Sequence, residues 1–294
     1  MTVRFACVAL IGKYQSTEVA DSVRNTAAAL RARGHEVLIE QGTASALGRV
    51  EEWTAATYDE IGQRANLALV IGGDGTLLGC ARRLVEYDVP LVGVNQGRVG
   101  FLTDIACTQA AERLTEILDG HFVEERRTML LGEIWRGGEK VFVSTVLNDI
   151  VLGKGETGRM IEFDVSIDED FVYTQRSDGM IIATPTGSTA YALAANGPIL
   201  HPAVPAIALV PLCPEALSAR PVTLPDSCEI RLTLHATHEA RAHFDGQSHF
   251  ELRAGDTVFV RRSPHVLRLV HPPGGGRYFA MLREKLHWSA PARP

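Results

Sequence analysis

The chain has 294 residues, which is enough for one large domain or two ordinary ones. Hydrophobic residues make up 46% and charged residues 22%, and this balance excludes a wholly disordered chain. The 29 basic and 35 acidic residues give a net charge of −6, so the basic footprint of a dedicated nucleic-acid binder is missing. A phosphate-bearing small molecule stays compatible, because it needs only local arginines or backbone amides.

The cysteines and the apolar runs indicate where in the cell the protein is located. The five cysteines are scattered without a CxxC pair, which favours a reducing environment and small core residues over catalytic ones. The apolar run at the N-terminus is interrupted by Arg4 and is too short for a secretory signal. No run approaches the ~18 apolar residues of a membrane span. We therefore expect a cytoplasmic protein that does not enter a membrane.

The first hundred residues alternate between strand and helix patterns. Continuous apolar runs predict buried strands at Phe5–Ile11, Glu36–Glu40, Leu67–Ile71 and Val89–Val94. Helical spacing falls between them, at Val19–Arg33, in part of Gly48–Arg64 and at Thr76–Tyr87. Strands that recur with helices between them indicate βαβ units and a parallel sheet.

The pattern changes after Cys107. One more helix is expected at Ala110–Leu118, and short β-rich runs separated by Gly and Asp turns follow it. These runs are Met129–Trp135, Lys140–Val146, Asp149–Leu152, Ile161–Ile167, Phe171–Thr174, Met180–Ala183, Glu229–Ala236, Glu239–Phe244 and Thr257–Arg261. We expect an α/β domain at 1–105 and an antiparallel β domain at 106–276. The helical tail Tyr278–Trp288 is expected to return to the first domain, which then includes about 277–294.

The sharpest local motif is Gly72-Gly73-Asp74-Gly75-Thr76, placed directly after a buried strand and before a helix. Glycines let a phosphate or ribose approach the backbone, and the amides at a helix N-terminus form an anion cradle. A carboxylate repels phosphate, so Asp74 is expected to meet a hydroxyl or a phosphate-bound metal instead. The alternative is a tight turn that uses Asp-Gly for its backbone freedom.

A second motif, Thr184–Tyr191, is rich in small hydroxyl residues and follows the strand-like run Met180–Ala183. Its hydroxyls can bond to ligand hydroxyls and phosphates, and Tyr191 can offer a stacking face. Ser188 or Thr186 is expected to cap a short helix that begins near Thr189. A capped helix without any ligand is the plainer interpretation of this segment alone.

Three further polar groups end β-rich runs: Asn148-Asp149, Arg176–Gly179 and Asp245–Gln247. A polar pair inside the apolar stretch around Asn148 must find partners, face a cavity or lie at an exposed edge. The other two groups read as a solvated turn and a hairpin turn.

Several site types are absent from the sequence. It contains no GxxxxGK[ST], no GxSxG and no GxGxxG after the first strand. The spacings of His235, His238, His243 and His249 fit no zinc motif.

Taken together and in order, these segments resemble the NAD kinase family along nearly the whole chain. The matching segments are GGDGT at 72–76, VGVNQGRVGFLTDI at 92–105, LNDIVL at 147–152, the block at 176–202, PLCPEALSARP at 211–221, DGQ at 245–247 and the tail helix. The resemblance implies an α/β N-terminal domain with a parallel sheet, an all-β sandwich-like C-terminal domain, and a C-terminal helix that returns to the first domain. GGDGT alone is less specific, because lipid kinases and phosphofructokinases carry related loops.

The implied reaction moves the γ-phosphoryl of ATP, or of inorganic polyphosphate in some members, to the adenosine 2′-hydroxyl of NAD to give NADP. Asp74 would orient and deprotonate that hydroxyl, and Gly72, Gly73, Gly75 and Thr76 would bind phosphate. Mg²⁺ would arrive with ATP and neutralise charge. No nucleic acid or membrane partner is implied.

The resemblance also implies which residues bind NAD. Asn148 and Asp149 would contact the adenosine, Asp178 and Ala190 would lie near the nicotinamide half, and Phe101 would border the adenine. The remaining implied contacts are Asp74, Gly75, Arg159, Arg176, Thr189, Tyr191, Ala192, Leu193, Ala194 and Gln247. Glu215 departs from the family, in which many members carry His at this position of the loop.

Two other functions compete with an NAD kinase. A lipid kinase would share the GGDGT loop but leaves the Thr184–Tyr191 segment unexplained, and no amphipathic basic helix or lipidation signal is visible. A regulator that binds NAD or NADP without turnover is disfavoured because Asp74 is present. A homodimer or homotetramer is expected from the family, with hydrophobic strand edges of the β domain as its contacts.

Overall fold

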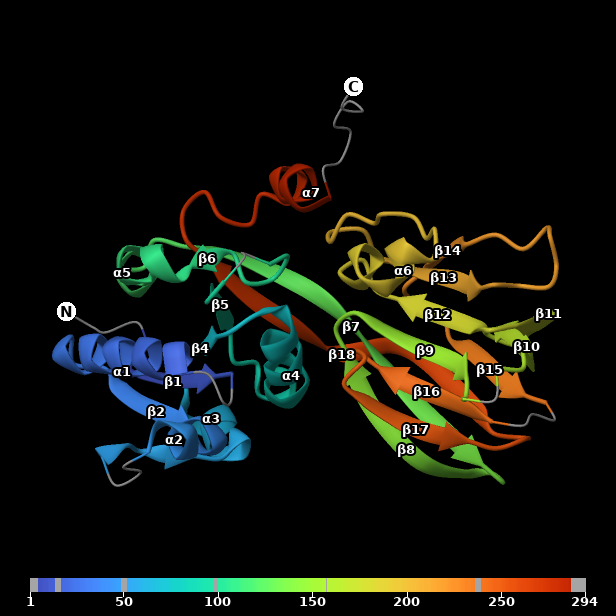
Figure 1. The fold of residues 1–294 in the computed structure, drawn as a ribbon, viewed down its shortest axis with the longest axis horizontal. Helices are drawn as coiled ribbons and strands as arrows, with labels where there is room; N and C mark the ends of the chain where they lie inside the picture. Colours follow the sequence, from blue (N-terminus) through green and yellow to red (C-terminus); the bar gives the residue numbers. More distant parts are fainter. Residues whose placement is uncertain are drawn as a thin grey trace. The chain divides into compact units, whose positions relative to one another are not determined.

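The chain is represented by a computed structural model that describes residues 5–13, 17–48, 52–97, 100–156, 158–235 and 239–286. It forms two compact units (Figure 1), which we call unit 1 (Met1–Arg126 with Leu267–Pro294) and unit 2 (Arg127–Val266). The units divide at 126/127 and 266/267, whereas the sequence pattern suggested 105/106 and 276/277. The difference arises because Leu114, Ile117 and Val270 pack in the core of unit 1.

Unit 1 is built on a parallel sheet with the strand order β5-β4-β1-β2-β3, and β6 pairs with β5. Its strands are β1 (Cys7–Gly12), β2 (Glu36–Glu40), β3 (Ala55–Ala56), β4 (Leu67–Ile71), β5 (Leu91–Asn95) and β6 (Ile105–Ala106). All of these pairs are parallel, as the alternating pattern predicted. Buried side chains on both faces explain why these strands read as continuous apolar runs.

Helices cover the sheet of unit 1. They are α1 (Thr17–Ala32), α2 (Gln41–Leu47), α3 (Tyr58–Arg64), α4 (Asp74–Leu84) and α5 (Ala110–Leu118), with short 3₁₀ turns η2 (Val85–Tyr87) and η3 (Cys107–Gln109). The unit also contains helix α7 (Tyr278–Leu286), which follows β18. Local sequence starts α3, where Thr57 and Glu60 form a reciprocal capping box. The tail helix α7 belongs to unit 1, as predicted, and its Leu282 is buried. Residues 287–288 of the predicted tail helix lie outside the described residues.

Unit 2 is an antiparallel β-sandwich, which confirms the predicted class of the second domain. One layer contains the path β11-β10-β15-β18 and the β7–β8 pair, and the other has the order β14-β13-β12-β9-β16-β17. The strands are β7 (Val123–Arg136), β8 (Glu139–Val146), β9 (Asp149–Lys154), β10 (Ile161–Ile167), β11 (Asp170–Ser177), β12 (Gly179–Ala183), β13 (Ala206–Leu212), β14 (Val222–Pro225), β15 (Ile230–Leu234), β16 (Ala240–Phe244), β17 (Ser248–Leu252) and β18 (Thr257–His271). The short helices η4 (Gly187–Thr189) and α6 (Tyr191–Ala194) follow β12.

The core of the sandwich explains which face of β9 is free for a site. Ile150 and Leu152 point into the main core together with the large buried rings of Phe163 and Phe244. Successive side chains of a strand point to opposite faces of the sheet. Asp149, Val151 and Gly153 therefore belong to the other face of this layer.

Two long strands exceed their sequence patterns. β7 and β18 each begin in one unit and end in the other, so the predicted runs Met129–Trp135 and Thr257–Arg261 cover only parts of them. Each strand changes surroundings along its length. A single alternation of apolar residues therefore does not mark its full extent.

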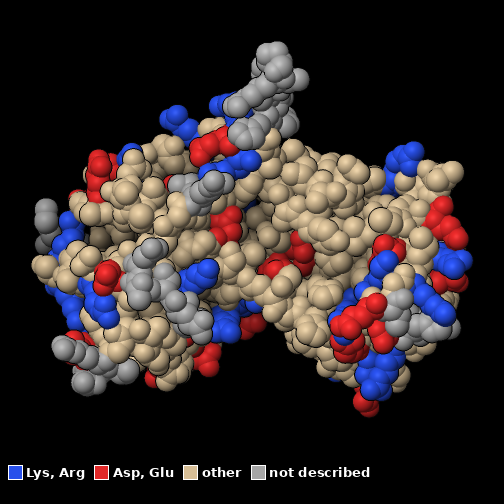
Figure 2. Space-filling view, viewed as in Figure 1, with Lys and Arg blue, Asp and Glu red and all other residues tan. Residues whose placement is uncertain are grey.

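The surface agrees with the composition. On the face shown in Figure 2, basic and acidic side chains of the described residues are interspersed, and no continuous basic stripe crosses it. Among the described helices, none combines the length and apolar character needed to cross a membrane. The cytoplasmic location stays a prediction.

Candidate active site

Asp74 lies at the start of α4, immediately after strand β4. Gly72 packs closely there, since a Cβ at this position would lie 2.6 Å from the Thr76 hydroxyl oxygen. Gly73 is open, because a Cβ there would meet nothing within 4 Å. Gly75 is exposed. The turn thus leaves open space at Gly73 and an exposed residue at Gly75, beside the Asp74 carboxylate.

The Asp74 carboxylate is fixed by a neighbouring loop. Its Oδ2 accepts from the Phe101 amide (2.8 Å), and its Oδ1 accepts from the amides of Leu102 and Thr103 (3.1 Å each). The Thr103 hydroxyl adds a fourth bond to Oδ1 (2.9 Å) and itself accepts from Asn95 (2.7 Å). Oδ1 thus takes three bonds and Oδ2 takes one, so Oδ2 keeps lone-pair capacity for another donor.

Close packing supports this arrangement. A Cβ at Gly100 would lie 2.0 Å from Asp74 Oδ1, so only glycine fits beside the carboxylate. Phe101 contributes its backbone amide to Asp74, a role that its predicted adenine contact did not include. Arg98 and Val99 of this motif lie outside the described residues.

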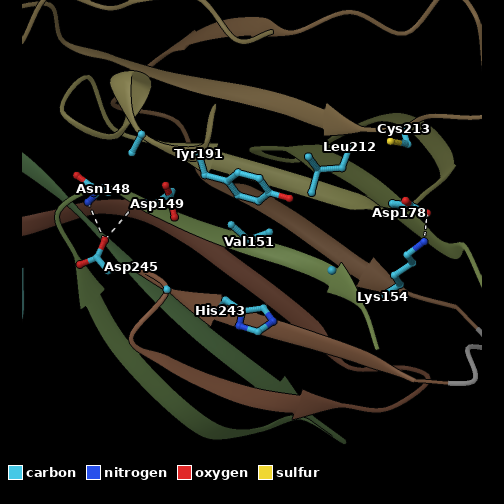
Figure 3. Close-up of a pocket in the computed structure, with 13 residues that line it drawn as sticks. Asn148, Asp149, Val151, Lys154, Asp178, Tyr191, Leu212, Cys213, His243 and Asp245 are labelled. Atoms are coloured by element: carbon cyan, nitrogen blue, oxygen red, sulfur yellow. Dashed lines mark hydrogen bonds and ion pairs between the residues drawn. The ribbon is translucent and has the colours of Figure 1, made fainter. Parts of the chain in front are cut away.

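Unit 2 contains a cavity of about 590 Å³ beside β9. Figure 3 shows Asn148, Asp149 and Asp245 gathered at one end and the Lys154–Asp178 pair at the other, with the Tyr191 ring between them. The lining residues are Asn148, Asp149, Val151, Gly153, Lys154, Asp178, Ala190, Tyr191, Leu212, Cys213, His243, Asp245 and Gly246. The size is within the usual range for small-molecule sites, about 300–1,000 Å³.

A buried carboxylate builds the acidic end of the cavity. Asp245 accepts from the amides of Leu147 (3.1 Å), Asn148 (2.8 Å) and Asp149 (3.2 Å), and its own amide donates to the Asp149 carbonyl (3.0 Å). Asp245 and Gly246 both have positive φ, 52° and 63°, as the predicted hairpin turn requires. The turn therefore also anchors the start of β9.

The electrostatics of this end single out Asp149. It is 5% exposed. Burial, and then the nearby charge of Asp245, raise the pKa of Asp149 to about 7. A carboxyl group with such a pKa is present in both protonation states near neutrality, so it can either donate or accept a hydrogen bond.

The other end of the cavity carries an ion pair. Lys154 lies at the end of β9, and its Nζ is 2.8 Å from Asp178 Oδ1. Between the two ends the Tyr191 side chain is half exposed and presents an aromatic face. The cavity thus offers an acid and an amide at one end, a stacking ring in the middle and paired charges at the other.

The hydroxyl-rich segment is mostly structural. Thr184 accepts from the Gly187 amide (3.0 Å) and donates to the Leu147 carbonyl (2.5 Å), while Ser188 bonds to Pro185 and Leu200. The expected cap at Ser188 or Thr186 is therefore wrong. The hydroxyl of Thr184, the residue that follows β12, accepts from the Gly187 amide at the start of η4 instead. Gly187 must be glycine, since a Cβ there would lie 2.1 Å from the Asn148 carbonyl oxygen.

The structure brings five of the expected NAD-binding residues together in the unit 2 cavity, namely Asn148, Asp149, Asp178, Ala190 and Tyr191. Others from unit 2 do not line it: Arg159, Arg176, Thr189, Ala192, Leu193, Ala194 and Gln247. Ala192 is fully buried in the packing of α6. Arg176 pairs with Glu215 on the surface (3.3 Å), so the residue that departs from the family has a defined partner.

Several site residues escaped the sequence analysis. Lys154 and His243 line the cavity, although no motif marks them. Cys213 also lines it and lies in the matching segment 211–221, but no ligand contact was expected of it. Burial, followed by the charges of His249 and Arg241, lowers the pKa of His243. The even spacing of Asp149, Val151 and Gly153 indicates which residues of one strand share a face. It does not indicate which residues of the neighbouring strands lie on that face.

The cysteines differ in burial, and the described histidines are dispersed. Cys7, Cys80 and Cys228 are buried as predicted, but Cys107 and Cys213 are exposed, so that expectation is wrong for these two. Cys107 begins the short 3₁₀ turn η3, and Cys213 lies in the loop after β13, where the backbone runs at the surface. The histidines do not cluster as a metal site: His243 and His249 face each other across a hairpin, His235 pairs with Asp164, and His238 lies outside the described residues.

Comparison with known proteins decides the family. Residues 8–122 match the ATP-NAD kinase N-terminal domain and residues 147–272 match the ATP-NAD kinase C-terminal domain. An NAD kinase of Azoarcus sp. (strain BH72) is 64% identical over 293 residues, covering 100% of this chain and 99% of the relative. The chain belongs to the ATP-NAD kinase family. An NAD kinase of Bordetella avium (strain 197N) is 49% identical over 97% of this chain and 96% of its own length.

Solved structures agree on the fold of this family. Yeast NADH kinase complexed with NADH has a TM-score of 0.90 at 23% identity, over 99% of this chain and 93% of that one. An NAD kinase from Archaeoglobus fulgidus in complex with ATP has a TM-score of 0.73 at 22% identity, over 96% and 98%. The expected family, fold and enzyme class are thereby confirmed: the chain is a phosphotransferase of the family that phosphorylates NAD with ATP.

Proposed function

We propose that this chain transfers the γ-phosphoryl group of ATP to the adenosine 2′-hydroxyl of NAD, with Asp74 as the general base. The observation that carries the proposal is the Asp74 carboxylate, which is aimed by three consecutive amides and a threonine hydroxyl. A fixed acceptor with capacity left on Oδ2 suits the orientation and deprotonation of a hydroxyl group. Phosphoryl transfer depends mainly on such positioning and on electrostatic stabilisation.

The phosphate role is assigned to the turn that precedes α4. Gly73 and Gly75 leave the backbone accessible, and the first amides of α4 carry the positive end of the helix dipole. Gly72 and Thr76 pack against each other and shape this turn. We therefore assign phosphate contacts to Gly72, Gly73, Gly75 and Thr76.

The NAD contacts are assigned to the cavity of unit 2. The Asn148 amide and the Asp149 carboxyl can bond to the adenosine, since an amide side chain matches the donor and acceptor edge of adenine. Asp178, with its Lys154 partner, and Ala190 are assigned to the nicotinamide half. Tyr191 supplies a ring for stacking, and Phe101 is assigned to the border of the adenine.

We assign Mg²⁺ to the ATP substrate and not to a protein site. Among the described residues, no group of three or more His, Cys, Asp or Glu side chains could hold a metal ion. We propose that Mg²⁺ is bound by the phosphate oxygens of ATP, where it neutralises their charge. We also propose that polyphosphate serves as an alternative donor, and an assay with each donor decides this.

A homodimer or homotetramer is proposed for the assembly. Edge strand β11 exposes Phe171 (63%) and Val172 (43%), and the loop after β13 exposes Leu217 (92%). Light scattering on the purified protein measures the number of subunits.

The test of the proposed base is Asp74→Asn. The variant keeps the shape of the side chain but cannot take the proton, so kcat should fall roughly 100- to 10,000-fold. The Kd for NAD, measured by calorimetry, should stay within about threefold, because we assign the dinucleotide contacts chiefly to other residues. Asp21→Asn, on the exposed face of α1, is the control and should match wild type. Turnover by Asp74→Asn within a few-fold of wild type would contradict the base assignment.

A further inference from the structure

A buried histidine ends strand β18 between two carboxylates. His271 is 4% exposed. Its Nδ1 lies 2.8 Å from Asp104 Oδ2 and its Nε2 lies 3.2 Å from Glu125 Oε2. The two carboxylates bond to opposite ring nitrogens and do not converge on one point, so the cluster is an ion-pair chain rather than a metal site.

Asp104 directly follows the loop residues that donate hydrogen bonds to Asp74. Its own amide follows those of Phe101, Leu102 and Thr103, the three that donate to the Asp74 carboxylate. Asp104 Oδ2 accepts from His271 and from the Gly276 amide (3.2 Å), whereas Oδ1 is buried with no hydrogen-bond partner in the described chain. The position of the Asp104 side chain is therefore set by Oδ2 and its two partners.

The segment that follows β18 closes over this pair. A Cβ at Gly275 would lie 2.9 Å from Asp104 Oδ2 and 3.1 Å from the His271 Cβ. Gly276, at φ +67°, lies against the imidazole ring. The glycines let the backbone approach the pair, and both side chains are buried, so their attraction is screened little.

The protonation of His271 fits this geometry. Burial alone would lower its pKa, but the hydrogen bonds and charges of Asp104 and Glu125 outweigh burial and raise the pKa of His271 to about 9. The imidazolium therefore persists at neutral pH and compensates the buried Asp104 carboxylate.

We propose that His271 is a positioning residue for Asp74, acting through Asp104 and the three amides that precede it. The inference rests on the proposed role of Asp74 as the base. One end of the loop 101–104 is tied to β18 and the other end presents the amides, so a change at His271 displaces the donors that aim the carboxylate. A misplacement of 1 Å at a reacting group costs roughly 100-fold in rate.

The experiment compares Asp104→Asn and His271→Ala in the full chain. His271→Ala leaves a buried charge uncompensated and is expected to lose stability. Asp104→Asn removes that charge and lets the histidine become neutral, so it keeps the fold and serves as the main variant. His235→Ala is the matched control, because His235 Nε2 lies 2.9 Å from Asp164 Oδ1 in unit 2.

Three readouts are measured: kcat, the KM values for NAD and ATP, and amide hydrogen exchange at residues 101–103. In Asp104→Asn we expect kcat to fall at least ~10-fold, KM to stay within ~2-fold, and exchange at 101–103 to accelerate. The control should change none of these. In wild type, kcat should fall as pH rises through about 9, and His271→Ala should lack that limb.

Two results separate this proposal from the base assignment. A folded Asp104→Asn variant with unchanged kcat and unchanged exchange at 101–103 overturns the positioning role, even if Asp74→Asn is inactive. If Asp74→Asn stays active while exchange at 101–103 accelerates in Asp104→Asn, the link between His271 and the loop stands and the base assignment fails.

Discussion

Two aspartates with proposed roles, one in each unit, lie in opposite surroundings. Asp74 receives four hydrogen bonds from one loop, so its carboxylate is held in a fixed orientation. Asp149 lies buried near a second carboxylate, so its charged form is opposed. The two aspartates are thus suited to different chemical roles. The groups around each one come from the end of a strand and the loop beside it.

Asp149→Asn should stabilise the protein in a pH-dependent way. The pKa of Asp149 is raised from 3.8 to about 7, so the folded state binds its proton more tightly than the unfolded state does. This group therefore costs stability progressively as pH rises from 3.8 to 7. The variant should melt a few degrees above wild type at pH 7 and above, with the gap closing toward pH 4, while NAD binding weakens.

Thermal denaturation across this pH range measures the effect. Asp170→Asn, at the exposed start of β11, is the control and should shift the melting temperature equally little at every pH. A constant difference between Asp149→Asn and wild type would show that packing, and not ionisation, separates them.

For individual residues, the sequence predicted which residues are important but not which groups contact them. Asp74 was recognisable from the glycine-rich turn after a buried strand, and the Asn148-Asp149 pair was recognisable because it interrupts an apolar stretch. Three of the four donors to Asp74 are backbone amides, which every residue except proline carries, so no side-chain pattern marks them. Lys154 and His243 reach the cavity from strand positions whose facing direction depends on the register with neighbouring strands.

Among the elements, the β16–β17 turn has a role beyond reversing the chain. Asp245 holds the amides of residues 147–149, so it sets where β9 begins and how Asn148 and Asp149 are presented. The Asp168 turn between β10 and β11 is comparable. It has positive φ (55°), and its carboxylate accepts from the Glu229 amide (2.9 Å), but it does not line the cavity.

Asp245→Ala should therefore impair NAD binding more than Asp168→Ala does. Loss of the carboxylate leaves buried amides unpaired, at a cost of about 1–3 kcal/mol in unfolding free energy. We expect the KM for NAD to rise at least ~10-fold in Asp245→Ala and to stay within ~2-fold in Asp168→Ala. Steady-state kinetics with saturating ATP measures both. Equal KM changes in the two variants would show that any aspartate turn of the sandwich has this effect.

Most elements could be predicted because their patterns are local. The parallel strands of unit 1 are buried on both faces and read as unbroken apolar runs, and α1 and α5 show the spacing of a buried stripe. Strand β14 was missed because its side chains are largely exposed, and β17 was missed because its alternation is weak, with only Leu252 of its five residues buried. Helix α2 follows β2 without a turn, and its cap is Glu40, the last residue of that strand.

For the whole molecule, the two units differ in how the chain builds them. Unit 2 is one continuous segment, whereas unit 1 needs the end of the chain. Leu267, Leu269 and Val270 are buried there, and Arg268 pairs with Glu124 (2.8 Å). The C-terminal segment is therefore a structural part of the α/β unit rather than an appendage.

A chain that ends at Val266 should lose the stability of unit 1. The buried side chains of Leu267, Leu269, Val270, His271 and Leu282 disappear, and removal of each large apolar one costs roughly 2–5 kcal/mol. A chain that ends at Leu286 keeps every described element and should melt like the full chain. Amide exchange resolved by residue should show loss of protection at β4 and β5 in the shorter chain, with β12 and β13 less affected. Unchanged protection at β4 and β5 would contradict the dependence.

The continuation of β18 into unit 1 also sets an order for events at the ribosome. Leu269 pairs with Leu91, the first residue of β5, although the intervening segment contains all of unit 2. At about 5–20 residues per second, that segment takes roughly ten to thirty seconds to synthesise. Unit 2 can assemble during this interval, while the start of β5 waits with an unpaired backbone edge, the kind of surface that invites aggregation. The α/β unit begins first during translation and is completed last.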